Sequence, residues 1–448
     1  MNKALVYAEK NKERHLINLF KLLSQPSVSA SGEGIYDCAD LLADLLINTG
    51  FKVFMHSYAG SPPVIYAELM VGAPKTIIFY NHYDVQPVDP LSEWKSPPFK
   101  PEIREGKIFA RGIADNKGNI MSRLLAVESY FQGTGTLPVN VKWVLEGEEE
   151  IGSSHLEQFV ADKKEVLQGE GIIWESGSRD ARGRPIISFG CKGILYAELI
   201  ARNARRDLHS AYASIVDNPA WHLLKTLGCL KEVSDDRILI PGFYDEVLPP
   251  NSEELEMLDK YPFEEETFKQ EMGIAKFLGN LSGLELKKKL LYEPTCNICG
   301  IASGYSGPGS KTVLPHKAEA KIDFRLVPNQ KAQGLFEKMK THLTNSGFGD
   351  IEVIPYGLED PAQTPVESGL KEVVVDTARD IWGVDPLLSP RMAGTGPMAV
   401  FSKHLNLPIV EGIGVGNFSS AVHAPNENCL VEDYFKVVNW VIKILQRI

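Results

Sequence analysis

Two histidines and three carboxylates lie beside short apolar runs or in glycine-flanked loops, where open α/β sheets form their ligand sites. These five residues are His82, Asp115, Glu150, Glu175 and His423. A mixture of imidazole and carboxylate ligands suits zinc, manganese or cobalt better than calcium. If one carboxylate bridges two ions, the five residues would build a two-metal hydrolytic site.

Four glutamates crowd the segment that follows the apolar run 139–145; they are Glu146, Glu148, Glu149 and Glu150. Neighbouring carboxylates repel each other unless solvent or a cation neutralises them. At the mouth of a buried sheet a cation is the better explanation. One carboxylate would then bind metal while its neighbour acts as a general base.

His82 and Asp84 are two residues apart and follow the apolar run TIIFY (76–80). Residues i and i+2 share one face of an extended chain. Asp84 is therefore placed to hold one ring nitrogen of His82 while the other binds metal.

Each of these motifs also has a structural explanation when it is taken alone. A histidine near a turn is commonly a surface residue, an acidic stretch is commonly a solvated loop, and Asp115 could cap a helix. The functional interpretation depends on the combination of the motifs.

The elements that must position these residues are buried strands and amphipathic helices. Apolar runs predict strands at 76–80, 139–145, 171–174 and 407–413, and helical spacing predicts helices at 118–131 and 432–445. The first 50 residues are predicted to form two helices, of which the second covers 35–49. Apolar strands that alternate with helices indicate a mostly parallel sheet covered by helices on both faces.

The pattern changes near residue 194. Segments 194–202 and 316–327 alternate between apolar and polar residues like half-exposed antiparallel strands, and helices are expected near 219–232 and 330–345. The charged region 245–295 is expected to be irregular. We therefore predict an α/β catalytic domain in two parts, 1–193 and 362–448, with an α+β domain inserted at 194–361.

The composition is that of an ordinary globular protein. The chain has 448 residues, 44% of them hydrophobic, and a net charge of −11, which argues against general nucleic-acid binding. The six cysteines, the lack of a signal-peptide pattern and the lack of a long apolar run predict a cytoplasmic protein outside the membrane.

Three motifs, HYDVQP (82–87), ARGIADNKG (110–118) and EEIGS (149–153), resemble the signatures of a co-catalytic zinc amidohydrolase and peptidase family. This family includes carnosinase, cytosolic nonspecific dipeptidase, aminoacylase, acetylornithine deacetylase and succinyl-diaminopimelate desuccinylase. The resemblance continues in family order through 207–214 and 309–328 to VHAPNE (422–427), and it is greatest to the dipeptidase branch.

The resemblance implies a role for each candidate residue in the first and last parts of the chain. Asp115 would bridge two divalent ions, zinc being favoured over manganese or cobalt. His82 and Glu175 would complete one ion site, and Glu150 and His423 the other. Glu149 would be the general base, and Asp84 would orient His82.

The chain departs from the family pattern at two positions. Glu175 and Asn116 stand where the family often has aspartate. Glutamate is one methylene longer, which affects the geometry and metal preference of that ion site, whereas Asn116 is not a ligand. The resemblance also implies a cis peptide bond between Asp115 and Asn116.

Within the inserted domain and just after it, the resemblance implies a substrate site. His209 would polarise the scissile carbonyl, often from the partner subunit of a homodimer that forms through the inserted lid. Arg325 would bind a substrate carboxylate, for which its planar guanidinium is suited. Backbone groups of Gly394, Thr395 and Gly396 would also contact the substrate.

The expected activity is metal-dependent hydrolysis of dipeptides or short peptides with a free carboxylate. The alternative is an N-acyl-amino-acid deacylase, because both substrate classes present an amide and a carboxylate. The long segment 230–300, which resembles dipeptidase lids, favours peptides.

Overall fold

A computed structural model describes residues 2–365 and 367–448 and divides the chain into two compact units. Unit 1 consists of Met1–Gly190, Gln363–Arg391 and Pro397–Ile448, and unit 2 consists of Cys191–Ala362 and Met392–Gly396. The chain passes between the units within the short strands β9 (Gly190–Cys191) and β18 (Ala362–Gln363), and again on either side of Met392–Gly396.

Unit 1 is built around a six-stranded sheet of order β1-β2-β6-β3-β7-β20. The strands are β1 (Lys52–His56), β2 (Val64–Leu69), β6 (Asn140–Glu146), β3 (Thr76–His82), β7 (Ile172–Ile173) and β20 (Ile409–Val410). The last four strands of this order are parallel, whereas β2 is antiparallel to both β6 and β1. The predicted α/β class with a mostly parallel sheet is confirmed. The antiparallel edge formed by β1 and β2 was not predicted.

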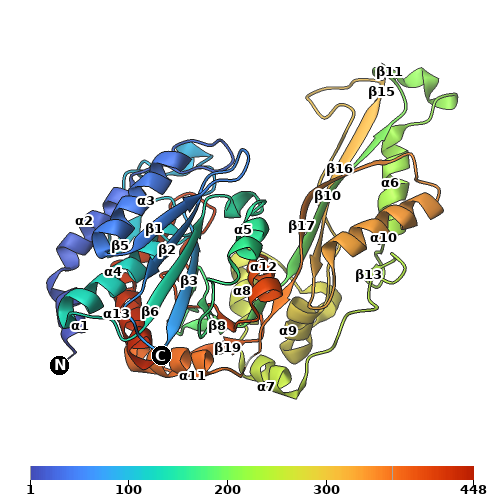
Figure 1. Cartoon of the computed structure of the whole chain (residues 1–448). Helices are drawn as coiled ribbons and strands as arrows, with labels where there is room; N and C mark the ends of the chain where they lie inside the picture. Colours follow the sequence, from blue (N-terminus) through green and yellow to red (C-terminus); the bar gives the residue numbers. More distant parts are fainter. Residues whose placement is uncertain (1, 366) are drawn as a thin grey trace. The chain divides into compact units, whose positions relative to one another are not determined.

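Helices cover this sheet on both faces, as Figure 1 shows. They are α1 (Lys3–Lys10), α2 (Lys12–Leu23), α3 (Ile35–Thr49), α4 (Lys117–Thr134), α5 (Leu156–Lys163), α11 (Gly369–Trp382), α12 (Met398–Leu405) and α13 (Val431–Arg447). The prediction of two helices in the first 50 residues is wrong, because the N-terminal helical stretch is interrupted at Asn11 and forms both α1 and α2.

Neighbouring residues of β3 face the two helical layers. On one face, the Phe79 ring lies 5.7 Å from the guanidinium of Arg123 on α4. On the other, the Tyr80 ring stacks 4.0 Å from Trp174 and lies 5.0 Å from Phe401 on α12. Burial on both faces explains why β3 is a continuous apolar run, and it makes the end of this strand a rigid support.

Small sheets complete unit 1. One contains β4 (Glu102–Arg104), β5 (Lys107–Phe109) and β21 (Asn428–Leu430), and another pairs β8 (Ile186–Ser188) with β19 (Leu387–Ser389). The pairing of β5 with β21 brings the loop before α4 beside the loop before α13, although the two are about 300 positions apart.

Unit 2 contains a separate antiparallel sheet of order β14-β16-β10-β17, with α6 (Pro219–Leu230) and α10 (Ala332–Asn345) packed on it. Its strands are β14 (Asn297–Ser303), β16 (Lys317–Leu326), β10 (Gly193–Arg202) and β17 (Glu352–Glu359). The short pairs are β11 (Leu208–His209) with β15 (Val313–Leu314) and β12 (Lys231–Glu232) with β13 (Arg237–Ile238). The antiparallel strands and both helices agree with the predictions.

The prediction that 245–295 is irregular is wrong. This region forms α7 (Ser252–Lys260), α8 (Glu265–Met272) and α9 (Gly283–Tyr292). A capping box between Asn251 and Glu254 starts α7. The helices bury few side chains, so their polar sequences lack the apolar stripe by which helices are predicted.

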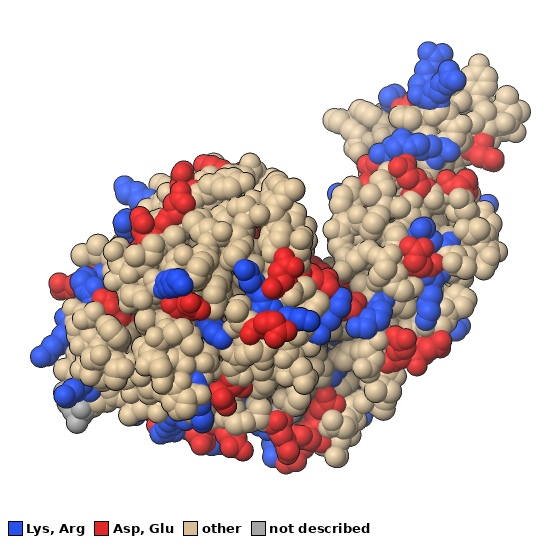
Figure 2. All heavy atoms as spheres, viewed as in Figure 1, with Lys and Arg blue, Asp and Glu red and all other residues tan. Residues whose placement is uncertain are grey.

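Positive and negative side chains are interspersed over most of the visible face of the protein (Figure 2). All six cysteines are free thiols. Within residues 2–365 and 367–448, no helix combines the length and apolarity that crossing a membrane requires.

His15 provides a prediction about acid stability. It is fully buried on α2, and neither ring nitrogen has a hydrogen-bond partner among the described residues. Burial lowers its pKa from 6.5 to about 4, so the folded protein favours neutral imidazole. The stability that depends on neutral His15 is complete above pH 6.5 and is lost as the pH falls from 6.5 towards 4.

We therefore expect the melting temperature of the wild type to fall more steeply across this pH window than that of His15→Leu. Differential scanning calorimetry at several pH values measures both slopes. Parallel curves for the two proteins would contradict the prediction.

Candidate metal centre

The parallel strands deliver three candidate side chains to one edge of the sheet. His82 is the last residue of β3, Glu150 lies in the 3-10 helix Glu149–Ile151 after β6, and Glu175 follows β7 by two residues. Carboxyl ends of parallel strands meet at the same edge, which is where open α/β sheets bind ligands.

Asp115 lies between two histidines. Its Oδ1 is 3.0 Å from Nε2 of His82, and its Oδ2 is 2.9 Å from Nε2 of His423. Each carboxylate oxygen therefore faces a different imidazole, an arrangement that allows one carboxylate to bridge two ions. The Asp115–Asn116 peptide bond is cis, as the family resemblance implies.

Two further carboxylates flank this central group. Oε2 of Glu150 lies 3.2 Å from Nε2 of His423, and Oε2 of Glu175 lies 3.9 Å from Nε2 of His82. Ligand atoms of His82, Asp115 and Glu150 lie within 4.8 Å of one another, so the residues proposed for the two ion sites form one cluster. The structure thus brings together all five candidate ligands.

Unsatisfied carboxylate oxygens show that this donor set fits a cation. Oε1 of Glu150 and Oε2 of Glu175 are buried and have no hydrogen-bond partner among the described residues. A buried carboxylate is costly unless it is paired or coordinates a metal. Oxygen and imidazole donors together suit a divalent transition metal or zinc.

The electrostatics of the cluster favour added positive charge. Burial alone would raise the pKa of Asp115, but hydrogen bonds with His423 and His82 hold it well below its usual value. Hydrogen bonds to Asp115 and Glu150 raise the pKa of His423 to about 10. Burial raises the pKa of Glu175 to about 8. Without a metal ion, Glu175 therefore tends to keep its proton, and Asp115 is stabilised by protonated histidines. A bound cation would supply the positive charge that these protons supply here.

Glu149 lies next to this cluster, at the start of the 3-10 helix. Burial raises the pKa of its carboxyl group, and the nearby charge of Glu175 raises it further. A carboxyl group with a raised pKa is suited to both accepting and returning a proton near neutral pH.

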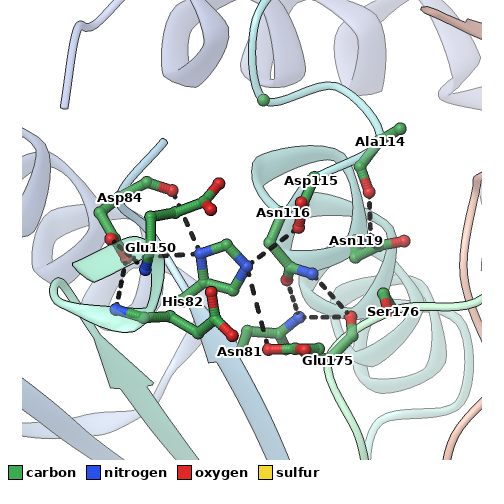
Figure 3. A network of polar contacts seen from close by, with 12 residues as sticks. Asn81, His82, Asp84, Ala114, Asp115, Asn116, Asn119, Glu150, Glu175 and Ser176 are labelled. Atoms are coloured by element: carbon green, nitrogen blue, oxygen red, sulfur yellow. Dashed lines mark hydrogen bonds and ion pairs between the residues drawn. The ribbon is translucent and has the colours of Figure 1, made fainter. Parts of the chain in front are cut away.

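Asp84 contacts both the His82 ring and the turn that carries Glu149 and Glu150. Its Oδ1 lies 3.3 Å from Nδ1 of His82 (Figure 3). The same carboxylate accepts hydrogen bonds from the backbone N–H groups of Glu149 at 3.3 Å and Glu150 at 3.0 Å. Asp84 thus links the histidine to the turn that carries two functional candidates, a second contact that sequence spacing did not reveal.

Sequence reasoning missed Glu427, which holds the Asp115 loop. This fully buried carboxylate accepts hydrogen bonds from the backbone N–H groups of Gly112, Ala114 and Asp115 at 2.8–3.0 Å. It also pairs with Nη1 of Arg111 at 2.8 Å. Glu427 therefore fixes the loop backbone next to the central carboxylate.

A signal for this pair was present in the sequence. Arg111 lies in the motif that contains Asp115, and Glu427 in the motif that contains His423. Opposite charges in two motifs that must meet at one site suggest a buried ion pair.

The remaining candidates lie in unit 2. Nη1 of Arg325 donates a hydrogen bond to Oγ1 of Thr395 at 2.8 Å, and Arg325 lines a cavity of 590 Å³. Gly394 accepts a hydrogen bond from the backbone of Lys192 at 3.0 Å. His209 is exposed at the end of β11, and the carbonyl of Gly396 is 3.6 Å from the thiol of Cys191. Arg325 and the Gly394–Gly396 turn are thus neighbours.

Known proteins match this chain over most of its length. Residues 78–447 match the family described as Peptidase family M20/M25/M40. Human Beta-Ala-His dipeptidase is 30% identical over 376 residues, covering 82% of this chain and 73% of that protein. Cys-Gly metallodipeptidase DUG1 of Candida albicans is 28% identical over 458 residues, covering 95% of this chain and 93% of that protein.

Solved structures are similar over nearly the whole chain. An M20 family metallo-carboxypeptidase of Sulfolobus solfataricus, Sso-CP2, has a TM-score of 0.93 and 41% identity, covering 97% of this chain and 98% of that one. Human carnosine dipeptidase 1 has a TM-score of 0.83 and 25% identity, covering 99% of this chain and 98% of that one. These matches confirm the resemblance found in the sequence.

Proposed function

The chain belongs to peptidase family M20/M25/M40, and from this premise we propose that it is a two-metal dipeptidase. It is a metallohydrolase of the dipeptidase and carboxypeptidase branch of that family. The observation that carries the proposal is Asp115, whose two oxygens face different histidines, with Glu149 beside them.

We assign one ion to His82, Asp115 and Glu175, and a second to Asp115, Glu150 and His423. Two divalent ions supply Lewis acidity, which lowers the pKa of water and polarises the substrate carbonyl. Zinc is the proposed metal, with manganese and cobalt as the alternatives. The unsatisfied oxygens of the two glutamates support this assignment.

Glu149 is proposed as the general base and then the general acid. Its carboxylate accepts a proton from the attacking water and later returns it to the leaving amine. Asp84 is proposed to keep the His82 ring and the Glu149 backbone in place, and its contacts to both support this role.

Unit 2 is proposed to bind the substrate. The Arg325 guanidinium would pair with a substrate carboxylate, and backbone groups of Gly394, Thr395 and Gly396 would contact the peptide. His209 would donate a hydrogen bond to the developing oxyanion. We also propose a homodimer that forms through unit 2, in a reducing cytoplasmic compartment, which the six free thiols support.

A specific observation favours a second candidate. The structure that is 41% identical is named a carboxypeptidase, whereas the relatives named dipeptidases are 30% and 28% identical. Both activities release a residue with a free carboxylate, so an Arg325 site would serve either. They differ in the length of peptide that they accept on the amino side of the cleaved bond.

Three substrates that share a carboxyl-terminal leucine test the proposal: Ala-Leu, Ala-Ala-Leu and N-acetyl-Leu. A dipeptidase should cleave Ala-Leu with a kcat/KM about tenfold or more above that of the other two substrates. A tenfold difference corresponds to about 1.4 kcal/mol of transition-state stabilisation. Preference for Ala-Ala-Leu would identify a carboxypeptidase, and preference for N-acetyl-Leu a deacylase. Either result would overturn the dipeptidase assignment.

His209 provides a prediction about shared active sites. His209→Ala should leave both ions bound but reduce turnover by roughly 10²–10³, which is the usual effect of removing one oxyanion donor. If His209 serves the neighbouring subunit, mixing His209→Ala with Glu149→Gln should restore activity, because one site of the mixed dimer has both groups. Incubating each variant alone is the control. Heterodimers without restored activity would show that His209 does not act across subunits.

A further inference from the structure

Two buried asparagines join the segments that carry three of the proposed ligands. Asn81 precedes His82, Asn116 follows Asp115, and both are fully buried. Nδ2 of Asn81 donates hydrogen bonds to Oδ1 of Asn116 and, at 2.9 Å, to the backbone carbonyl of Glu175. Nδ2 of Asn116 donates to the same carbonyl at 3.1 Å (Figure 3). One carbonyl therefore receives both amides.

The orientation of both amides follows from their partners. Oδ1 of Asn81 accepts hydrogen bonds from Nη1 of Arg123 at 2.6 Å and Nε1 of Trp143 at 3.0 Å. These two groups are obligate donors, so Nδ2 of Asn81 must face the other way. Because Oδ1 of Asn116 then receives the Asn81 amide, Nδ2 of Asn116 must donate to Glu175. The order of donors and acceptors has a single solution.

These contacts matter because Glu175 lies beyond the end of its strand. β7 has only two residues, Ile172 and Ile173, and the next backbone contact is the N–H of Trp174 to the carbonyl of Val410 at 2.9 Å. At Glu175, the side-chain amides of Asn81 and Asn116 hydrogen-bond the backbone carbonyl in place of a neighbouring strand. The carboxylate of Glu175 extends from this held peptide towards His82.

We propose that Asn81 and Asn116 form an amide clamp of positioning residues that sets the affinity of one ion, the one assigned to His82, Asp115 and Glu175. The inference rests on the two-ion part of the proposed function. The clamp fixes the spacing between three ligand segments, whereas Glu150 and His423 are held by other contacts. Glu175, whose backbone carbonyl receives both amides, belongs to this ion site alone, so the clamp acts chiefly on this ion, whereas Asp115 is shared by both sites.

Titration of the metal-free, full-length protein with Co²⁺ tests this inference, with calorimetry for the affinities and visible absorption for the coordination at each step. The wild type should bind two equivalents. Asn116→Ala should weaken one binding step by about 10–100-fold, the usual cost of losing a partner that orients a ligand, and weaken the other step clearly less; equal weakening of both steps would contradict the inference. Glu175→Gln should weaken the same step.

Asn116→Asp distinguishes the effect of the lost hydrogen bond to Glu175 from the effect of an added negative charge near the ions. The aspartate has nearly the same shape and can still accept the Asn81 hydrogen bond, but it cannot donate to the carbonyl of Glu175. The clamp predicts weaker Co²⁺ binding at the same step as in Asn116→Ala. Tighter binding would mean that the added negative charge governs the site, and it would overturn the inference.

Asn140 provides a matched control at the opposite end of β6. It is also a buried amide, with its Nδ2 donating to the carbonyl of Ala73 at 2.8 Å and its Oδ1 accepting from the N–H of Val71 at 2.9 Å. Asn140→Ala should reduce the melting temperature yet keep both Co²⁺ affinities. If Asn140→Ala also weakened one binding step to a similar degree, the weaker Co²⁺ binding would follow from a less stable fold and not from the clamp, and the inference would be overturned.

Dipeptide hydrolysis is measured separately, so the two proposals can fail independently. A wild type that binds two Co²⁺ ions but cleaves no dipeptide disproves the proposed substrate and leaves the clamp intact. Unchanged binding in both Asn116 variants disproves the clamp and leaves the dipeptidase assignment intact. A wild type that binds fewer than two ions overturns both.

Discussion

Replacing Glu149 with glutamine is expected to reduce turnover of the dipeptide by about 10²–10⁴-fold while both metal ions stay bound. The amide keeps the size of the side chain but cannot accept the proton of the attacking water. Nothing in the substitution removes a proposed ligand. Metal content by mass spectrometry and kcat on Ala-Leu measure the two effects in one preparation.

Glu150→Gln is the matched comparison, since the two residues are adjacent and the chemical change is identical. Oε2 of Glu150 lies 3.2 Å from the His423 ring, so its replacement should also weaken metal binding. Near-normal turnover in Glu149→Gln, or equal metal loss in both variants, would refute the assignment of Glu149 as the base and Glu150 as the metal ligand.

Substitution of Asp115 by alanine is expected to have the second large effect, loss of both ions and of all metal-dependent activity. Its two oxygens contact different histidines, so one substitution removes a donor from each proposed ion site. It also leaves His82 and His423 without the carboxylate that raises both of their pKa values. Metal content after dialysis and hydrolysis of Ala-Leu measure the outcome.

Asp433→Asn is a suitable control for the loss of a buried carboxylate. Asp433 pairs with Arg179 at 2.8 Å within unit 1 and belongs to neither ion site. It should retain both ions even if the protein is less stable. Retention of one tightly bound ion by Asp115→Ala would show that Asp115 belongs to one site only.

Local sequence predicted the elements that are buried on both faces. The long apolar runs of β3 and β6, and the helical spacing within α4 and α13, follow from burial against neighbouring layers. The partly exposed edge strand β1 and the polar helices α7 to α9 have weaker patterns and were not predicted. Strand β2 was also not predicted, although nearly all of its residues are buried. Local patterns thus predicted the strands with long apolar runs and the helices with regularly spaced apolar residues.

The candidate ligands could also be found from sequence, because the chemistry of a metal site restricts residue types. Imidazole and carboxylate groups at strand ends are uncommon enough that five of them indicate a site. The residues that hold these ligands carry no such signal. Asparagine and arginine occur throughout any globular protein, and nothing local distinguishes Asn81, Asn116 or Arg123.

The amino-acid sequence by itself therefore determined the family and the class of chemistry, and it supplied the candidate side chains. Tertiary structure alone decided how those side chains are held. Glu427 bonds to backbone groups 312 to 315 positions away, and Asn81 bonds to a carbonyl 94 positions away. The physical reason is that a hydrogen bond depends on distance and direction in space, and only the folded chain brings such distant groups within 3 Å.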